Sequence, residues 1–431
     1  MILSIQRLRA WVRLRLEPLM PALLRVLFPW IARVLRWRAG HFPRRAVLYS
    51  GQAYYNAWYL SRALRKRGWR ADVLNWDPEE SAQIYYHGED YKFSYGAVMT
   101  PFRYLLFYLR ALWTYDVFHF SNAHSMLIGH DLNYWFMRHF STGFEIRFLK
   151  DCGKKIVYSN NGCLDGVSQS SFRKWIPGPP VCDICPWKNV PTVCSDERNL
   201  AWGRFRNSMA DYQCTLGGNR ADYNDNPRVH EVPEFYCLDP DVWRPDLAIP
   251  EKYRLHHPPG TVLLYHSVGN FETRTGDDGV NIKSTHVYHP LLQALKAEGL
   301  PVEMMFFTKV PNKELRFYQA QAGIFLDMLS FGWFGATARE AMMLGKPVIC
   351  YLRPVWLESA RKEIPEYVDE LPIVSATPET IREVLVDLVT HPEKREEIGR
   401  RSRAFALKWH SMDAGARRLS RIYSELLGRA Q

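Results

Sequence analysis

Residues 332–350 constrain this 431-residue chain more than any other segment, because they combine glycines, a short helix and an apolar strand. They run Gly-Trp-Phe-Gly-Ala-Thr-Ala-Arg-Glu-Ala-Met-Met-Leu-Gly-Lys-Pro-Val-Ile-Cys. Gly332 and Gly335 let backbone amides approach a ligand, and the N–H groups that begin the following helix suit a diphosphate. A further glycine ends the helix before the strand that starts at Val348. The order predicts an α/β fold with an anion-binding loop, although an ordinary strand-loop-helix with a surface Glu340 fits as well.

This segment resembles the donor-site signature of retaining GT-B glycosyltransferases of the glycogen-synthase and lipid-mannosyltransferase kind. Their usual form is Glu-Gly-Phe-Gly, four residues, then Glu-Ala-Met, with Gly-x-Pro-Val following. The resemblance implies a nucleotide-sugar donor whose ribose is held by Glu340. It also implies that three neighbours belong to the donor site: Phe334, Gly335 and Ala336. The relatives carry another glutamate, which holds the transferred sugar, where this chain has Gly332, and Asp327 is the nearby acid that could replace it.

Length and composition indicate a folded enzyme of two domains, since one hydrophobic core rarely supports 431 residues. The chain is 47% hydrophobic, yet no stretch reaches the ~18 uncharged apolar residues of a transmembrane helix. Arginines interrupt every candidate apolar region of a signal peptide, so we expect a cytoplasmic protein. The implied fold is GT-B, an α/β architecture in which two Rossmann-like domains face each other across a cleft and a C-terminal helix crosses back.

Residues 45–250 are expected to form the first domain, a Rossmann-like unit that binds the acceptor. An apolar strand precedes Gly51, which we assign to the donor site, and a helix and a second strand follow. The turn lacks the three-glycine dinucleotide fingerprint, so no nicotinamide or flavin cofactor is indicated. Relatives have Asp-Val-x-His at one strand end and Gly-x-x-Asp after another. The matches are His119, a candidate catalytic residue with His124 as the competing choice, and Asp165, a candidate donor-binding residue.

Residues 251–400 are expected to form the donor domain, and residues 401–431 the crossing helix. After the first strand of this domain, relatives have an arginine and a lysine that bind the donor diphosphate. The matching residues here are Arg274 and Lys283, which the resemblance implies are catalytic. Two fixed cations can stabilise a leaving diphosphate without a metal ion. The only Asp-x-Asp triplet, residues 239–241, lies in the expected interdomain linker, so no catalytic metal is expected.

Residues 1–44 carry most of the chain's net positive charge and are expected to associate with an anionic membrane. Residues 1–45 contain ten arginines and one acid, in a chain whose net charge is +11. Apolar residues and tryptophans surround a narrow basic arc, which is typical of an interfacial helix. Three prolines predict two or three short helices here: Pro18, Pro21 and Pro29. A basic arm docked on the protein itself and a mispredicted start codon are alternatives. Nucleic acid is not expected, because the remainder of the chain has no such surplus.

Four cysteines lie in a proline-rich insertion, residues 177–214: Cys182, Cys185, Cys194 and Cys214. In a reducing cytoplasm, four clustered thiolates favour a structural Zn²⁺ over disulfides. Only one Cys-x-x-Cys pair is present, and Cys163 is an alternative fourth ligand. Closed coordination leaves no position for substrate, so the metal would brace the insertion beside the acceptor cleft.

Together these features favour a peripherally membrane-attached glycosyltransferase that retains the configuration of the transferred sugar. The expected partners are a nucleotide-sugar, a glycan or lipid-linked acceptor, and an anionic membrane surface. Two alternatives stay open: a soluble transferase acting on a small molecule or protein, and a catalytically degenerate GT-B protein that serves as a membrane scaffold. The missing glutamate at Gly332 is what favours the scaffold.

Overall fold

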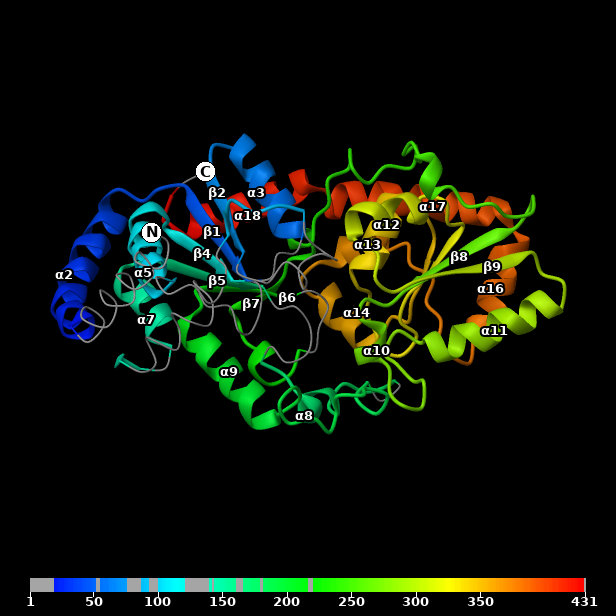
Figure 1. The fold of residues 1–431 in the computed structure, drawn as a ribbon, viewed down its shortest axis with the longest axis horizontal. Helices are drawn as coiled ribbons and strands as arrows, with labels where there is room; N and C mark the ends of the chain where they lie inside the picture. Colours follow the sequence, from blue (N-terminus) through cyan, green and yellow to red (C-terminus); the bar gives the residue numbers. More distant parts are fainter. Residues whose placement is uncertain are drawn as a thin grey trace, which may run out of the picture.

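The computed structural model describes residues 19–51, 55–75, 87–92, 100–120, 139–141, 143–159, 166–178, 181–215 and 220–429. Four residues of the sequence hypotheses lie outside these ranges: Pro18, His124, Cys163 and Asp165. The described chain forms two parallel β-sheets with helices around them, side by side along the long axis of the molecule (Figure 1). This arrangement confirms the predicted pair of Rossmann-like units.

The first sheet has seven described strands in the order β3-β2-β1-β4-β5-β6-β7, and each neighbouring pair is parallel. Parallel strands with helices on both faces need apolar side chains, and Val47, Leu48 and Val117 are fully buried. The strands are β1 (Ala46–Gly51), β2 (Arg70–Asn75), β3 (Tyr91–Lys92), β4 (Val117–Phe120), β5 (Lys155–Ser159), β6 (Tyr212–Thr215) and β7 (Val229–Glu231). The helices of this unit include α3 (Tyr55–Lys66), α5 (Thr100–Thr114), α7 (Phe144–Asp151), α8 (Gln169–Phe172) and α9 (Asp196–Met209).

The second sheet has four described strands in the order β11-β10-β8-β9, again parallel. They are β8 (Val262–Ser267), β9 (Val302–Phe307), β10 (Ile324–Leu326) and β11 (Val348–Ile349). The helices are α10 (Phe271–Arg274), α11 (Thr285–Ala297), α12 (Asn312–Gln319), α13 (Ala336–Met343), α14 (Pro354–Arg361), α15 (Pro365–Glu370) and α16 (Ile381–Thr390). α10 and α13 follow β8 and β10 and lie on the side that faces the first sheet (Figure 1). Ligands of open parallel sheets bind at such strand ends.

The 3₁₀ helix η1 (Asp222–Asn224) joins β6 to β7, and two further 3₁₀ helices, η2 (Pro233–Phe235) and η3 (Glu251–Tyr253), lie in the connection between the two sheets. Two C-terminal helices, α17 (Pro392–Trp409) and α18 (Met412–Leu426), then return across the molecule. α17 packs on α13 in the second unit, and α18 packs on α3 in the first. The hydroxyl oxygens of Tyr423 in α18 and Tyr49 in β1 lie 2.8 Å apart. The predicted C-terminal helix that crosses back is therefore confirmed.

Residues 20–41 form one helix, α2 (Met20–His41), with Pro29 inside it. The break predicted at Pro29 is therefore wrong, because tertiary packing outweighs the hydrogen bond that a proline removes. Phe28, next to the proline, is 3% exposed and packs on Phe144 and Phe148 of α7, with ring centroids 5.5 and 4.5 Å away.

Polar contacts also fix α2 to the first unit. Arg38 is buried and pairs with the fully buried Asp116, whose Oδ1 lies 2.7 Å from Lys154 Nζ. Arg25 donates to the carbonyl of His139 at 2.6 Å, near the other end of the helix. Residues 20–41 are therefore docked on the protein itself, which was the alternative to a free membrane arm, and α2 belongs to the fold of the first unit.

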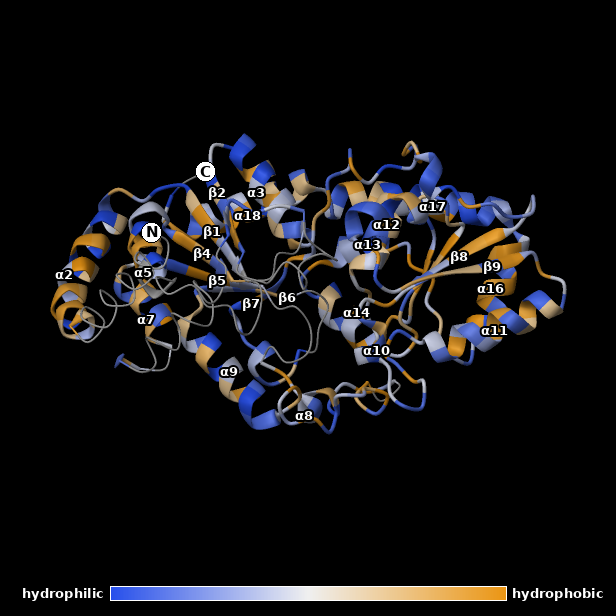
Figure 2. Cartoon of the chain, in the orientation of Figure 1, coloured by the Kyte–Doolittle hydropathy of each residue, from blue (hydrophilic) through white to orange (hydrophobic). Residues whose placement is uncertain are grey.

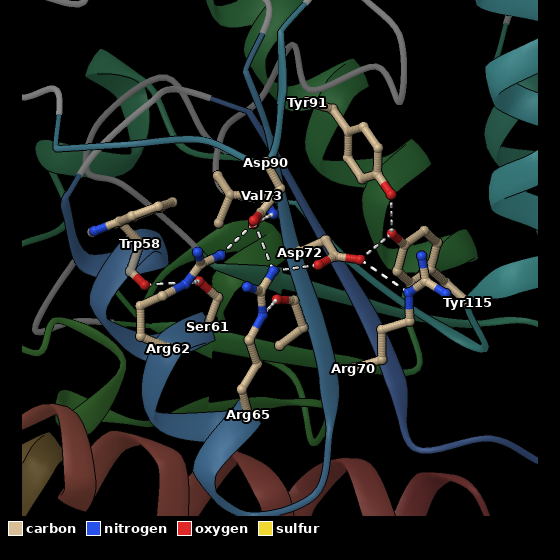
Figure 3. Close-up of polar contacts among 11 residues, drawn as sticks. Trp58, Ser61, Arg62, Arg65, Arg70, Asp72, Val73, Asp90, Tyr91 and Tyr115 are labelled. Carbon is tan, nitrogen blue, oxygen red and sulfur yellow. Dashed lines mark hydrogen bonds and ion pairs between the residues drawn. The ribbon is translucent and has the colours of Figure 1, made fainter.

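A network of arginines and aspartates holds β2 to the segment before β3 (Figure 3). Arg65 on α3 pairs with Asp72 on β2 and, at 2.7 Å, with Asp90. Asp90 also accepts a hydrogen bond of 2.9 Å from the amide of Val73. These contacts fix the segment that carries His87 against α3, so that His87 can reach the second unit.

Candidate functional site

A cavity of about 370 Å³ lies between the two units, and five of the predicted catalytic and donor-binding residues line it: Arg274, Lys283, Gly335, Ala336 and Glu340. Trp187, in the insertion of the first unit, and Tyr236, in the connection between the two sheets, line the same cavity, so it is not enclosed by the second unit alone. Its size falls within the ~300–1,000 Å³ of ordinary small-molecule sites.

Lys283, Asp327 and Gly335 form one hydrogen-bonded group beside this cavity. Lys283 Nζ lies 2.6 Å from Asp327 Oδ1, and the amide of Gly335 donates to Asp327 Oδ2 at 3.1 Å. Burial acts to raise the pKa of Asp327, but Lys283 and the Gly335 amide bring that pKa below its ordinary value. Asp327 is therefore ionised and orients the ammonium group, whose other N–H bonds can donate to a phosphate.

The Lys283 ammonium lies beside the N-terminus of α13. A Cβ atom built on Gly335, directly before that helix, would be 3.5 Å from Lys283 Nζ. The first amides of α13 and the ammonium together suit a diphosphate, since both favour negative charge. Arg274, at the end of α10, supplies a second cation to the same cavity.

Glu340 is 3% exposed and is held by side-chain amides from α12. Its Oε1 accepts from Asn312 Nδ2 at 2.9 Å, and its Oε2 accepts from Gln319 Nε2 at 2.7 Å. Burial raises the pKa of Glu340, while hydrogen bonds from Gln319, Asn312 and Tyr55 of α3 act to lower it. A carboxylate has capacity for further hydrogen bonds, so Glu340 can also accept from a vicinal diol such as ribose.

A chain of hydrogen bonds joins Glu340 to the first unit. Tyr59 Oη lies 2.8 Å from His87 Nδ1, and His87 Nε2 lies 2.6 Å from Asn312 Oδ1. Burial lowers the pKa of His87 to about 4, so the ring is neutral at pH 7. Because Asn312 donates its amide to Glu340, His87 Nε2–H donates to Asn312 and Nδ1 accepts from Tyr59. The sequence carries no motif that identifies His87 or Asn312.

Gly332 is a glycine for steric reasons. Its φ is +105°, and a Cβ atom there would lie 2.7 Å from Arg353 Cβ. Arg353 is fully buried, and its Nη1 donates to the carbonyls of Trp175 at 2.9 Å and Pro177 at 3.0 Å. Arg353 therefore ties the second unit to the first at the position where a glutamate side chain would otherwise project.

Gly332→Ala is expected to destabilise the protein by about 2 kcal/mol or more, because alanine adds both backbone strain and a clash with Arg353. Urea unfolding of the full chain measures the change. The matched control is Gly260→Ala, at φ +83° with no atom within 4 Å of the new Cβ, which tests the strain alone. Equal losses in the two variants would show that the Arg353 contact has no effect.

His119 does not line the cavity. It is fully buried, with Nδ1 at 2.6 Å from Tyr423 Oη and Nε2 at 2.5 Å from Ser159 Oγ. Burial lowers its pKa to about 3. Because both ring nitrogens are occupied within the core, we correct the catalytic assignment: His119 joins α18 to the first sheet.

The other predicted donor-binding residues differ in their positions. Phe334 is fully buried behind the loop and packs edge-on against Trp356, so it supports the cavity wall. Gly51 is the last residue of β1, so it lies at the carboxyl end of the strand, where ligands of parallel sheets usually bind. Asp165 lies outside the described residues, and its role stays a prediction.

Across the described ranges, no group of three or more histidine, cysteine, aspartate or glutamate side chains is arranged to hold a metal ion. The predicted Zn²⁺ site of Cys182, Cys185, Cys194 and Cys214 is therefore not formed in this structure. Cys214 lies in β6, which pairs with β5 and β7, so its thiol is fully buried in the sheet. The other three thiols are partly exposed in the insertion.

No protein-family model matches the chain, and no curated protein sequence matches it. Among solved structures, sucrose-phosphate synthase from Thermosynechococcus elongatus is similar, with 14% identity, a TM-score of 0.54, and coverage of 89% of this chain and 100% of that chain. HepE from Anabaena in complex with UDP has 11% identity, a TM-score of 0.50, and coverage of 88% and 99%. A structure of HepE with UDP and glucose gives 10% identity and the same TM-score and coverage. These likenesses confirm the predicted GT-B fold.

Proposed function

We propose that this protein is a glycosyltransferase that moves a sugar from a nucleotide-sugar donor to a glycan or lipid-linked acceptor. One observation carries the proposal: a cavity between two parallel-sheet units holds an ammonium group beside a helix N-terminus and, in the same wall, a buried carboxylate. The Lys283 ammonium and the N-terminus of α13 suit the diphosphate of such a donor, and the carboxylate of Glu340 suits the ribose. UDP in the similar HepE structure supports a nucleotide ligand. The proposed domain ranges are 45–250, to which α2 adds, then 251–400 and 401–431.

The proposed transfer retains configuration and uses fixed cations in place of a catalytic metal. The bond between the anomeric carbon and the diphosphate oxygen breaks, and the acceptor hydroxyl attacks the same face of the sugar. Its proton passes to the leaving phosphate oxygen. Lys283, Arg274 and the amides at the start of α13 stabilise the negative charge that develops on that phosphate. No carboxylate nucleophile is required.

Lys283→Ala is expected to lower kcat by about a hundredfold or more while changing KM by less than about threefold, because the phosphate charge grows as the bond breaks. The measurement is nucleoside diphosphate release from a panel of nucleotide-sugars by purified protein. Lys283→Arg keeps the charge next to Asp327 and should retain part of the rate. Lys296→Ala, on an exposed position of α11, is the matched control. An effect confined to KM would contradict the proposed role.

A second candidate is a binding protein without transfer activity, which Gly332 favours because the acid that relatives use for the sugar is missing. Nucleotide binding without release of diphosphate from any donor, with or without an acceptor, would select this candidate. A soluble transferase acting on a small molecule or protein is the remaining alternative, and acceptor screening with free sugars distinguishes it.

A lipid-linked acceptor would lie in a membrane, and we propose that the protein attaches peripherally to an anionic membrane surface. α2 lies at the end of the molecule away from the second sheet, and many of its residues are hydrophobic (Figure 2). Leu23, Val26, Trp30 and Trp37 are each more than half exposed, with 58%, 64%, 63% and 57% of their surface accessible. Arg33 and Arg36 are exposed on the same helix. None of the described helices is long and apolar enough to span a bilayer. Tryptophan and apolar side chains beside arginines suit the interface of an anionic bilayer.

Replacing Leu23, Trp30 and Trp37 together by glutamine should abolish co-sedimentation with anionic vesicles without unfolding the protein, because these side chains contribute little to the core. Added salt should weaken wild-type binding, since the attraction of arginines is screened. Leu407→Gln, an exposed leucine on α17 in the second unit, is the control. Unchanged sedimentation of the triple variant would move the attachment site elsewhere.

A further inference from the structure

Arg339 is a buried arginine in the wall of the proposed donor site. It lies on α13 next to Glu340, is 3% exposed, and lines the cavity between the units. Its guanidinium carbon lies 4.8 Å from the ring centre of Tyr236, 4.9 Å from Phe334 and 5.2 Å from Trp333. Three aromatic rings from the loop and the interdomain connection therefore surround the charged group.

No carboxylate neutralises this guanidinium in the described part of the chain. Its buried Nε has no hydrogen-bond partner, and neither an ion pair nor a hydrogen bond to Arg339 is found there. The aromatic faces attract a cation but cannot accept its directional hydrogen bonds in the way that oxygen does. A buried charge without a counter-charge is unfavourable, so the site is suited to an anionic ligand that enters from the cavity.

Two other charged side chains that line the cavity, Lys283 and Glu340, already have hydrogen-bonding partners. Lys283 is paired with Asp327 beside Gly335, at the start of α13. Both carboxylate oxygens of Glu340 accept hydrogen bonds from α12. Arg339 lies a full turn further along α13 than Gly335, against Tyr236 and Trp333. Its surroundings therefore differ from those of the cations proposed for the diphosphate.

We infer that Arg339 is a specificity-determining residue, which binds a carboxylate or phosphate carried by the transferred sugar or by the acceptor. This inference rests on the proposed function and names its substrate class, an acidic or phosphorylated sugar. The planar guanidinium can bind two oxygens of such a group at once. The rings of Tyr236 and Trp333 hold the guanidinium in position, so little side-chain freedom is lost when the anion binds.

Calorimetric titration of the full chain with UDP, UDP-glucose and UDP-glucuronic acid tests the donor as the source of the anion. GDP-mannose and GDP-mannuronic acid provide the same comparison for a second base. Wild-type protein should bind the acidic donor at least about tenfold more tightly than the neutral one. Arg339→Met should remove this preference, and Arg339→Lys should keep part of it. Arg274→Gln, in contrast, should weaken the nucleotide alone and all its sugars alike.

The second arm tests the acceptor. With the nucleotide at saturating concentration, glucuronic acid or glucose 6-phosphate should bind more tightly than glucose to wild-type protein but not to Arg339→Met. A preference in either arm that depends on Arg339 supports the inference and identifies the source of the anion. No preference in either arm, or equal loss of the nucleotide alone in Arg339→Met, would overturn it while the proposed function stands. Failure of every nucleotide to bind would overturn both.

Discussion

Alanine in place of Glu340 is expected to weaken nucleotide-sugar binding and transfer by about a hundredfold, because two charge-assisted hydrogen bonds to a ribose contribute roughly 3 kcal/mol. The same change leaves the buried amides of Asn312 and Gln319 without their acceptor. We therefore also expect a loss of about 1–3 kcal/mol in unfolding free energy, which a folded GT-B chain can tolerate. Titration with UDP or a UDP-sugar and urea unfolding measure the two effects separately.

Two variants separate the ligand contact from the structural one. Glu340→Gln keeps the size of the side chain and one acceptor oxygen, so it should restore most of the stability but little of the affinity. Glu383→Ala changes an exposed glutamate on α16 and should alter neither quantity. Wild-type affinity in Glu340→Ala protein would remove Glu340 from the donor site.

The part of the cavity wall that we propose binds the donor could be predicted because it depends on local sequence. Gly335, the start of α13 and Glu340 are adjacent in the chain, and one helical turn determines their relative positions. Lys283 was found by its place after β8. Asn312 and Gln319 were not, since an amide that supports a carboxylate has no characteristic spacing from it. Their role follows only from the packing of α12 against α13.

The incorrect assignments have a common physical cause, which is that sequence spacing does not report burial. His119 lies near the end of β4, as a catalytic histidine can, but α18 returns from the far end of the chain and covers it through Tyr423. Cys214 was grouped with the cysteines of the insertion because it follows them. The short strand β6 instead pairs with β5 and β7, and this pairing fixes its side chain inside the first sheet.

The basic segment at the start of the chain illustrates the same limit. Its composition suggested a membrane-associating arm, residues 1–44, that lies outside the first domain. In the structure, Leu24, Phe28 and Leu35 of α2 are at most 5% exposed and belong to the core under the first sheet. An amphipathic pattern thus identifies a helix between two environments, but one of them here is the protein itself.

Removal of residues 1–43 is accordingly expected to unfold or aggregate the first unit rather than only release the protein from membranes. Burial of three large apolar side chains contributes roughly 5 kcal/mol or more, which is comparable to the whole stability of many domains. The truncation also removes Arg38 and leaves Asp116 with fewer buried partners. Thermal unfolding and solubility of residues 44–431 and of the full chain provide the comparison. A truncation that begins at Leu19 keeps α2 and should unfold like the full chain, and an unchanged transition in residues 44–431 would show that the α2 contacts contribute little.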